Sequence, residues 1–195
     1  MTLKKLLFIT FIFLLTQVKV YSSEKSYLFG GAKIFNYGIE SSDLQSLNSS
    51  LVSLGFSSST SSTDNTGIGF SIGYGAEIIP NFFLEGSYVN YGTLKIETRL
   101  TGPTENLTTE ITGDGLAGAI KYTEEGFYVK AGLHSWDFTG TVTASLGSST
   151  EAIGSGTDPF FGIGFDYDQW ELGYENYQID NGNISAFTFT YSRKF

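Results

Sequence analysis

The sequence predicts an all-β fold, an eight-stranded antiparallel up-and-down transmembrane β-barrel, on three observations. The first is the segment Gly67 to Ile78, in which apolar residues alternate strictly with glycine, serine and glutamate. A period of two residues is typical of a β-strand with one apolar face. The other face is nearly bare of side chains, which predicts a narrow, crowded interior and an apolar face turned toward lipid.

Aromatic content and the pattern of connections are the other two observations. The chain carries 17 Phe, 12 Tyr and 24 Gly, a combination typical of barrels with aromatic girdles. Short turns at Pro80, Glu124 and Asp168 alternate with longer connections at Asn36–Thr66, Gly102–Asn106, Ala144–Gly156 and Asp180–Asn183. Outer-membrane barrels have short periplasmic turns and longer extracellular loops, so we expect the longer connections outside the cell.

The first residues have the pattern of a secretory signal peptide. Lys4 and Lys5 precede an apolar run from Leu6 to Leu15, and Val20-Tyr21-Ser22 offers a cleavage site. The run is shorter than the ~20 residues that a membrane helix needs, which argues against the alternative of a retained anchor. We therefore expect a signal peptide at 1–22 and an outer-membrane β-barrel domain at 23–195.

Charge and cysteine usage exclude several classes of function. Removal of Lys4, Lys5 and Lys19 leaves 11 − 3 = 8 basic residues against 20 acidic ones, a formal charge of −12. Such a chain does not bind nucleic acid by neutralising phosphates. The chain has no cysteine, which excludes disulfides, thiolate metal sites and a thiol nucleophile. No motif indicates a cofactor.

The first predicted strand is Tyr27–Phe35, with Leu28 and Ile34 toward lipid and Lys33 inward. The second is the glycine-rich segment that predicts the fold, and Ile79-Pro80-Asn81 forms a tight turn after it.

The segment Asn36–Thr66 lies between these two strands and is expected to be a long serine-rich loop. Within it, Ser42-Asp43-Leu44-Gln45 has the pattern of a capping box. Leucines at positions 44, 47, 51 and 54 then recur at helical spacing, and Gly55 suits the end of a helix. We expect a short helix that either folds over the barrel mouth or contacts a partner or the lipid surface.

The third strand begins at Phe82 and keeps one parity as far as Leu100, which predicts that Leu94, Ile96 and Leu100 face outward like Leu84. This length predicts a hairpin that projects beyond the bilayer and turns at Gly102–Glu105. The fourth strand returns to about Tyr122, with Leu116 and Ile120 outward.

The last four strands follow the same alternation. They are predicted at Phe127–Thr139, Pro159–Tyr167, Trp170–Gln178 and Ile184–Phe195. Proline is tolerated at the start of a strand, so Pro159 fits the beginning of the sixth. A loop rich in serine, glycine and threonine is expected at Ala144–Gly156.

Several short motifs lie in a fixed order along these strands. They are Gly31-Ala32-Lys33, Leu84-Glu85-Gly86 with Tyr88, Lys130 six residues before Trp136, Gly164-Phe165-Asp166-Tyr167, and a terminal Phe195. Together they resemble the small outer-membrane β-barrel proteins typified by the OmpA transmembrane domain, over Tyr27–Phe195. The resemblance implies that Phe195 is an assembly signal read by the barrel-assembly machinery.

The resemblance also implies a ladder of charges across the barrel interior, at Lys33, Glu85, Lys130 and Asp166. Ala117 and Glu171 stand where the family has basic partners, so the polar plug is expected to differ in this chain.

Parity alone places further acids inside the barrel. The inward acids are Glu77, Glu85, Asp166, Glu171 and Glu175. They could form a cation site or a carboxylate pair of an enzyme, but an ion-pair network is the simpler interpretation. Such a network would use Lys33 and Lys130 and could include Lys121.

His134 is the only histidine, and Ser135 follows it. Lipid-modifying barrel enzymes use a serine and a histidine on one wall, but neighbouring strand residues point to opposite faces. We therefore interpret His134 as structural and predict no catalytic residue. Glycine pairs such as Gly162-x-Gly164 lack the third glycine of a dinucleotide site and indicate close packing.

The sequence thus favours a monomeric outer-membrane barrel with no enzymatic activity and a structural or surface-interaction role. Its expected partners are outer-membrane lipid and, through its loops, an extracellular ligand or host surface. The interior of eight strands is about filled by side chains. The alternatives are a small cation-preferring pore, which planar-bilayer conductance would reveal, and a lipid-modifying barrel enzyme.

Overall fold

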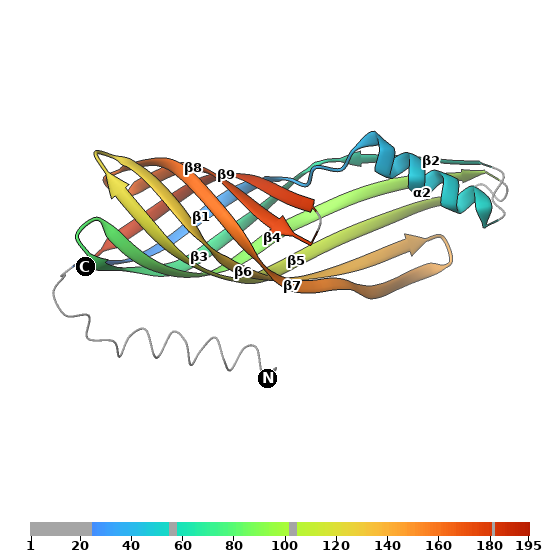
Figure 1. Cartoon of the computed structure of the whole chain (residues 1–195). Coiled ribbons are helices and arrows are strands. Elements are labelled where there is room, and N and C mark those ends of the chain that lie inside the picture. The colour runs from blue at the N-terminus through green and yellow to red at the C-terminus, as the bar shows by residue number, and fades with distance from the viewer. Residues whose placement is uncertain (1–24, 55–57, 102–104, 181) are drawn as a thin grey trace.

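The computed structural model describes residues 25–54, 58–101, 105–180 and 182–195, and the expected signal peptide at 1–22 lies outside them (Figure 1). Nearly all of the described chain is antiparallel β-structure. The elements in chain order are β1 (Ser26–Asn36), α2 (Ser41–Ser53), β2 (Ser58–Asp64), β3 (Thr66–Ile79), β4 (Phe82–Thr101), β5 (Glu105–Glu124), β6 (Phe127–Ala144), β7 (Gly147–Tyr167), β8 (Trp170–Ile179) and β9 (Gly182–Lys194).

Eight of these strands close into a ring. Each barrel strand pairs antiparallel with its chain neighbours, β4 pairs with β5, and β1 pairs with β9 over Tyr27–Asn36. The ninth strand of the sheet, β2, lies outside the ring, and its one partner within the described ranges is β4. The predicted eight-stranded up-and-down barrel is confirmed, and closure leaves no free edge in this part of the molecule.

Outward side chains form an apolar belt around the barrel. Alternate residues along each wall are exposed and apolar, whereas the residues between them are buried. The belt includes Leu28, Ile34, Phe70, Ile72, Ile120, Leu133, Phe161, Ile163, Leu172, Phe187 and Phe189. About eight residues rising ~3.3 Å each at a tilt of ~40° span roughly 20 Å, close to the ~25 Å apolar band of outer-membrane barrels.

The glycine face of β3 exists because rings from β1 occupy the space beside it. A Cβ atom added to Gly73 would lie 2.5 Å from the ring of Phe29, and one added to Gly75 would lie 2.5 Å from the ring of Tyr27. Real Cβ contacts are not that short, so any larger residue would displace a ring that fills the interior. The crowded interior inferred from the glycines is therefore present.

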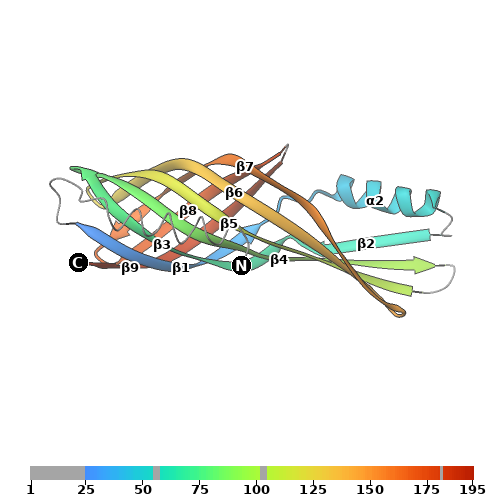
Figure 2. The same cartoon turned by 90° about the horizontal axis from the view of Figure 1, so that it is seen from below.

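Four strands continue well beyond the apolar belt. Figures 1 and 2 show β4 to β7 extending past the ends of β8 and β9, with β2 and α2 alongside. The expected loop at Ala144–Gly156 is wrong, because β6 runs to Ala144 and β7 begins at Gly147. The connection Asn36–Thr66 likewise contains a strand, β2, besides its helix. We call β2, α2 and the distal ends of β4 to β7 the extension.

The parity of β4 changes where the extension begins. The register of β4 against β5 shifts between Asn90 and Thr93, and Gly92 has φ +78°. This β-bulge turns Leu94, Ile96 and Leu100 from the outer face to the buried face, where Leu100 is 1% exposed. The expectation that they continue the outward parity of Leu84 is wrong, since a bulge inserts one residue and exchanges the faces.

The helix α2 is present where the leucine spacing predicts one, but its cap lies two residues earlier. Glu40 is the N-cap, and a capping box links it to Asp43 rather than starting at Ser42. Leu44 and Leu51 are half-buried, whereas Leu54 is 76% exposed. Gly55, the expected helix end, lies outside the described residues. Among the described residues, no helix has the length and hydropathy to cross a membrane.

A lysine at position 72 tests which face of the barrel meets lipid. Ile72 is 58% exposed in the middle of the belt, and a lysine facing hydrocarbon near the midplane costs roughly 2–4 kcal/mol. Ile72→Lys is therefore expected to lower the free energy of unfolding, measured by urea titration in phosphocholine vesicles. Thr60→Lys, on the exposed face of β2 outside the belt, is the control and should leave stability unchanged. Equal effects of the two lysines would contradict the lipid-facing assignment.

Candidate functional site

The barrel interior contains two layers of buried side chains. One layer, which we call the ion cluster, lies toward the short turns at Pro80, Glu124 and Asp168. The other, which we call the aromatic plug, lies toward the extension. Both layers are built from inward positions of the alternating strands, so the same parity that creates the apolar belt also places these groups.

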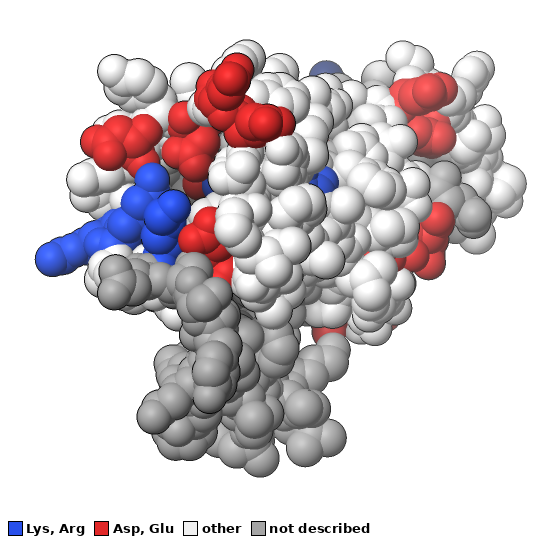
Figure 3. Space-filling view, turned by 60° about the vertical axis from the view of Figure 1, so that its left-hand side comes forward, with Lys and Arg blue, Asp and Glu red and all other residues white. Residues whose placement is uncertain are grey.

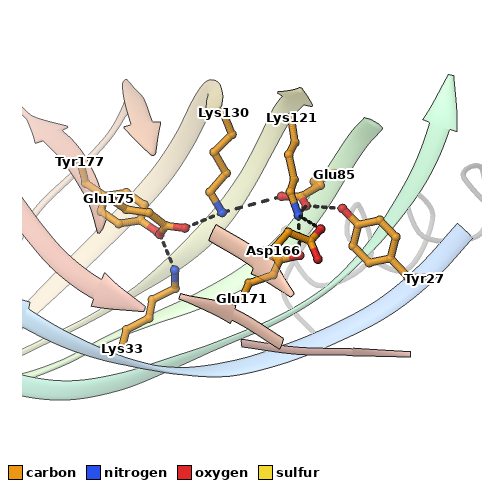
Figure 4. Close-up of polar contacts among 9 residues, drawn as sticks. All are labelled: Tyr27, Lys33, Glu85, Lys121, Lys130, Asp166, Glu171, Glu175 and Tyr177. Atoms are coloured by element: carbon orange, nitrogen blue, oxygen red, sulfur yellow. Dashed lines mark hydrogen bonds and ion pairs between the residues drawn. The ribbon is translucent and has the colours of Figure 1, made fainter. Parts of the chain in front are cut away.

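Glu175 on β8 is the centre of one half of the ion cluster. Lys33 from β1 and Lys130 from β6 both form ion pairs with its carboxylate, and the hydroxyl of Tyr177 donates a hydrogen bond to it. Figure 4 shows the two lysines approaching Glu175 from opposite walls. Side chains therefore cross the lumen here and tie distant strands together.

Lys121 on β5 is the centre of the other half. It forms an ion pair with Glu171 and lies 3.6 Å from a carboxylate oxygen of Asp166 and 3.8 Å from one of Glu85. Glu85 also lies 3.8 Å from Lys130 Nζ, which joins the two halves, and it accepts a hydrogen bond from the hydroxyl of Tyr27. Figure 4 shows this chain of contacts.

Lys33, Glu85, Lys130, Asp166 and Glu171 lie in one cluster, and two further residues expected inside the barrel, Glu175 and Lys121, link them. Glu77, another acid expected inside, lies 4.0 Å from Lys25 Nζ. Lys33 reaches Glu85 only through Glu175 and Lys130, and Glu171 is paired by Lys121. Both linking residues carry a sequence signal, because their parity is inward. Lys121 also stands directly opposite Lys130 in the β5–β6 register, so the two lysines need an acid between them.

The ion cluster is deeply buried. The side chains of Lys121 and Glu175 are each 1% exposed, and that of Lys33 is 4% exposed. Removal of one partner from such a pair leaves a buried charge uncompensated, which costs more than loss of the whole pair. The cluster therefore fixes the relative positions of the strands that it joins.

The aromatic plug surrounds His134. Tyr91, Phe160 and Tyr177 pack around the imidazole, with ring centroids 5.1–6.1 Å away, and Phe35 and Phe138 complete the plug. The Nδ1 atom lies 2.6 Å from the Tyr91 hydroxyl, and Nε2 lies 2.7 Å from the carbonyl oxygen of Gln178. A neutral imidazole that donates from Nε2 and accepts at Nδ1 satisfies both contacts.

Ser135 does not meet His134. The hydroxyl of Ser135 lies on the opposite face and contacts the backbone of Leu116, as the strand alternation requires. The two residues thus provide no serine–histidine pair. Among the described residues, no group of three or more His, Asp or Glu side chains could hold a metal ion.

Two cavities mark the ends of the ion cluster. A void of about 10 Å³ between the cluster and the aromatic plug, lined by Phe29, Ser71 and Ala119 among others, has room for about one water molecule. A recess of about 350 Å³ opens at the short-turn end and is floored by Lys121, Asp166 and Glu171. Figure 3 shows charged side chains gathered around that end. The ion cluster and plug fill the lumen between the recess and the extension.

The extension forms a second candidate site. Asn48 of α2 accepts hydrogen bonds from the hydroxyls of Ser59 and Ser61, at 2.9 and 2.8 Å, and Ser61 contacts Thr98 at 2.8 Å. These bonds hold α2 over the face of the sheet that buries Leu94 and Leu100.

The charge of the extension is mostly negative. Its acidic side chains include Asp43, Asp64, Glu97, Glu110, Asp114, Asp137 and Glu151, and Glu40 and Asp158 lie at its boundary, whereas Lys95 and Arg99 are the basic residues on β4 in this region.

A closed ring of eight strands, an apolar outer belt and a filled polar lumen define the eight-stranded outer-membrane β-barrel class. The fold and the belt indicate the outer membrane as the location of this chain.

Solved structures agree with that class. The attachment invasion locus protein Ail of Yersinia pestis has 12% sequence identity and a TM-score of 0.52, over 88% of this chain and 98% of Ail. OprG of Pseudomonas aeruginosa has 9% identity and a TM-score of 0.46 over 87% and 95% of the two chains. Neisserial surface protein A has 13% identity and a TM-score of 0.42 over 89% and 98%. Neither a protein-family model nor a curated protein sequence matches the chain.

At sequence identities this low, the similarity shows the fold alone. The Ail structure, with a TM-score of 0.52, supports that fold. The chain has the fold of the small outer-membrane β-barrels. A closer relation to the OmpA transmembrane domain remains a prediction.

A double-mutant cycle tests whether the ion cluster is one energetic unit. Lys33→Met and Glu175→Gln each remove one charge of a buried pair, and each is expected to cost roughly 3–5 kcal/mol of unfolding free energy. The double variant should cost clearly less than the sum, because the two groups contact each other. Urea unfolding in lipid vesicles measures all three variants.

The exposed pair Lys95–Glu97, whose nearest charged atoms lie 2.7 Å apart outside the belt, is the matched control. Its alanine variants should leave stability unchanged, because exposed pairs contribute little. Additive costs for Lys33 and Glu175 would show that the cluster does not act as a unit.

Proposed function

We propose that the protein is a non-conducting, non-enzymatic outer-membrane barrel whose extension projects from the cell and carries a surface-interaction role. The observation that carries this proposal is the combination of a filled lumen with strands that continue, as a folded sheet, far beyond the apolar belt. A barrel that only spans the membrane needs no such projection, and a pore needs an open lumen. The barrel would anchor the monomeric protein in the membrane, and the extension would contact the partner.

The pore alternative receives little support from the interior. Four carboxylates and three lysines of the ion cluster are paired with one another, so they offer no unpaired row of acids for a passing cation. The aromatic plug adds a second block behind them. The separation of His134 and Ser135 removes the sequence feature that suggested a lipid-modifying enzyme.

The charge of the extension limits the kind of partner. Ail has been crystallised with the heparin analogue sucrose octasulfate, a polyanion. The acidic extension of this chain would repel such a ligand, because like charges raise the free energy of association. We infer that its partner is a basic or neutral surface.

Cysteine labelling tests the orientation. The chain has no cysteine, so Ser62→Cys in β2 and Glu124→Cys at a short turn each introduce a single thiol. On intact cells, a membrane-impermeant maleimide is expected to react only with the cysteine at position 62. After permeabilisation, both should react. Equal labelling on intact cells, or labelling at position 124 alone, would refute the proposed orientation.

Shortening the extension tests its role. A variant in which turns join β1 to β3 at Asn36 and Thr66, β4 to β5 at Thr93 and Thr112, and β6 to β7 at Phe138 and Gly154 keeps the barrel and removes the whole extension, including α2 and β2. Heat-modifiable gel mobility confirms that the shortened barrel folds. Cells that display the full chain should adhere to cultured epithelial cells or to a surface coated with basic protein, and the shortened variant should not. Equal adherence of both strains would contradict the proposed role.

A further inference from the structure

The outer edge of β7 is unpaired throughout the extension. β6 pairs with β7 from Gly147 onward, but β8 pairs only with Phe160–Tyr167. Among the described residues, no strand pairs with the other side of Gly147–Pro159. Alternate backbone N–H and C=O groups along such an edge point away from the sheet and can pair with an added strand.

This edge is more accessible than the other edge of the same sheet. The opposite edge is β2, a strand of 7 residues that packs beside α2. By contrast, the residues from Ser148 to Ile153 are all exposed.

The sequence of the β7 edge lacks most of the features that protect exposed edges. Lysine and proline are the usual blocking residues, and neither occurs between Gly147 and Asp158. A single bulge at Ile153 interrupts the edge. Gly154 and Gly156 accommodate the ring of Trp136 on the inner face, since Cβ atoms there would contact it. The ring therefore packs against this part of the strand.

The surface beside the edge combines exposed apolar side chains with carboxylates. On the inner face, Val142 and Ile153 are apolar and are 40% and 56% exposed. Glu151 and Asp158 share this inner face, because they pair with Gly140 and His134, whereas Glu110, Asp114 and Asp137 lie on the opposite face. No lysine or arginine occurs in 105–115 or 137–158. An added strand would therefore meet Val142, Ile153 and Glu151 on the inner face, and it would lie near carboxylates on both faces of the sheet.

We propose that the β7 edge, Ser148–Thr157, binds an extended polypeptide segment of alternating basic and apolar residues, which adds to the sheet as a further strand. This rests on the proposed function, in which the extension is the interaction surface. Backbone pairing would supply affinity, and the acidic surroundings would select a basic partner. A second copy of this chain is a poorer occupant, because its Glu151 and the acids of its neighbouring strands would be repelled by those of the first copy.

The test uses full-length protein in phosphocholine nanodiscs and three fluorescent peptides long enough to span the edge. One peptide alternates lysine and valine, the second alternates glutamate and valine, and the third is the lysine peptide N-methylated at alternate residues. Anisotropy should show binding of the first only. N-methylation keeps the charge but removes the N–H groups of one edge, so it should weaken binding at least about tenfold. Empty nanodiscs control for binding to lipid.

Edge variants locate the site. Ala152→Lys, which blocks the edge, and Glu151→Lys, which reverses its charge, should each weaken binding of the lysine peptide at least about tenfold. Ser62→Lys on the β2 edge is the matched control and should bind normally. Gel mobility checks that every variant folds.

The opposite outcomes are distinct. Equal binding of the N-methylated peptide would show simple charge attraction and overturn the strand-addition proposal. Equal loss in Ser62→Lys would overturn the assignment to β7. Dimers in nanodiscs, abolished by Ala152→Lys, would make a second copy the occupant. Absence of peptide binding together with adherence that depends on the extension would overturn this inference while the proposed function stands.

Discussion

The narrow lumen of an eight-stranded ring is the constraint from which most of this structure follows. Lipid outside accepts only apolar side chains, so every inward position must be filled by a side chain that finds its partners within the ring. Near the short turns these partners are charges, and Glu175 and Lys121 each hold several opposite charges at once. Toward the extension, the inward side chains and their partners are aromatic. Glycines on β3 follow from the same constraint, because the rings of Tyr27 and Phe29 need the space.

The rigidity of this filled barrel allows strands to continue past the membrane. A free hairpin of this length would be only marginally stable in water, but here five strands remain side by side and α2 covers part of one face. Two bulges adjust the faces where the surroundings change from lipid to water. The bulge near Gly92 turns Leu94 and Leu100 to the buried face, and the bulge at Ile153 sets the register of β6 against β7.

Strand parity made the barrel predictable from sequence, because lipid imposes strict alternation on every wall. The inward charges at positions 33, 85, 130, 166 and 171 were found by the same alternation together with the family resemblance. The ion pairs among these residues could not be predicted in the same way. The stagger of the strands decides which side chains meet across the lumen, and parity does not give that stagger. The failure to predict two of the strands has a different cause. β2 and the distal part of β7 are strands of serine, threonine and glycine, whose composition is typical of loops. They are stabilised by pairing with β4 and β6 rather than by their own propensity.

The barrel and the extension are not independent units. Phe138 belongs to the aromatic plug, and Ile111 packs against that plug from the strand that leads into the extension. The apolar side of the extension therefore continues the barrel interior without a hinge between them. A surface built in this way is already ordered before it meets a partner, so association does not incur the entropic cost of ordering a flexible loop. Under the proposed function, the buried charges deep in the barrel would contribute to recognition indirectly, because they hold the strands whose far ends form the extension.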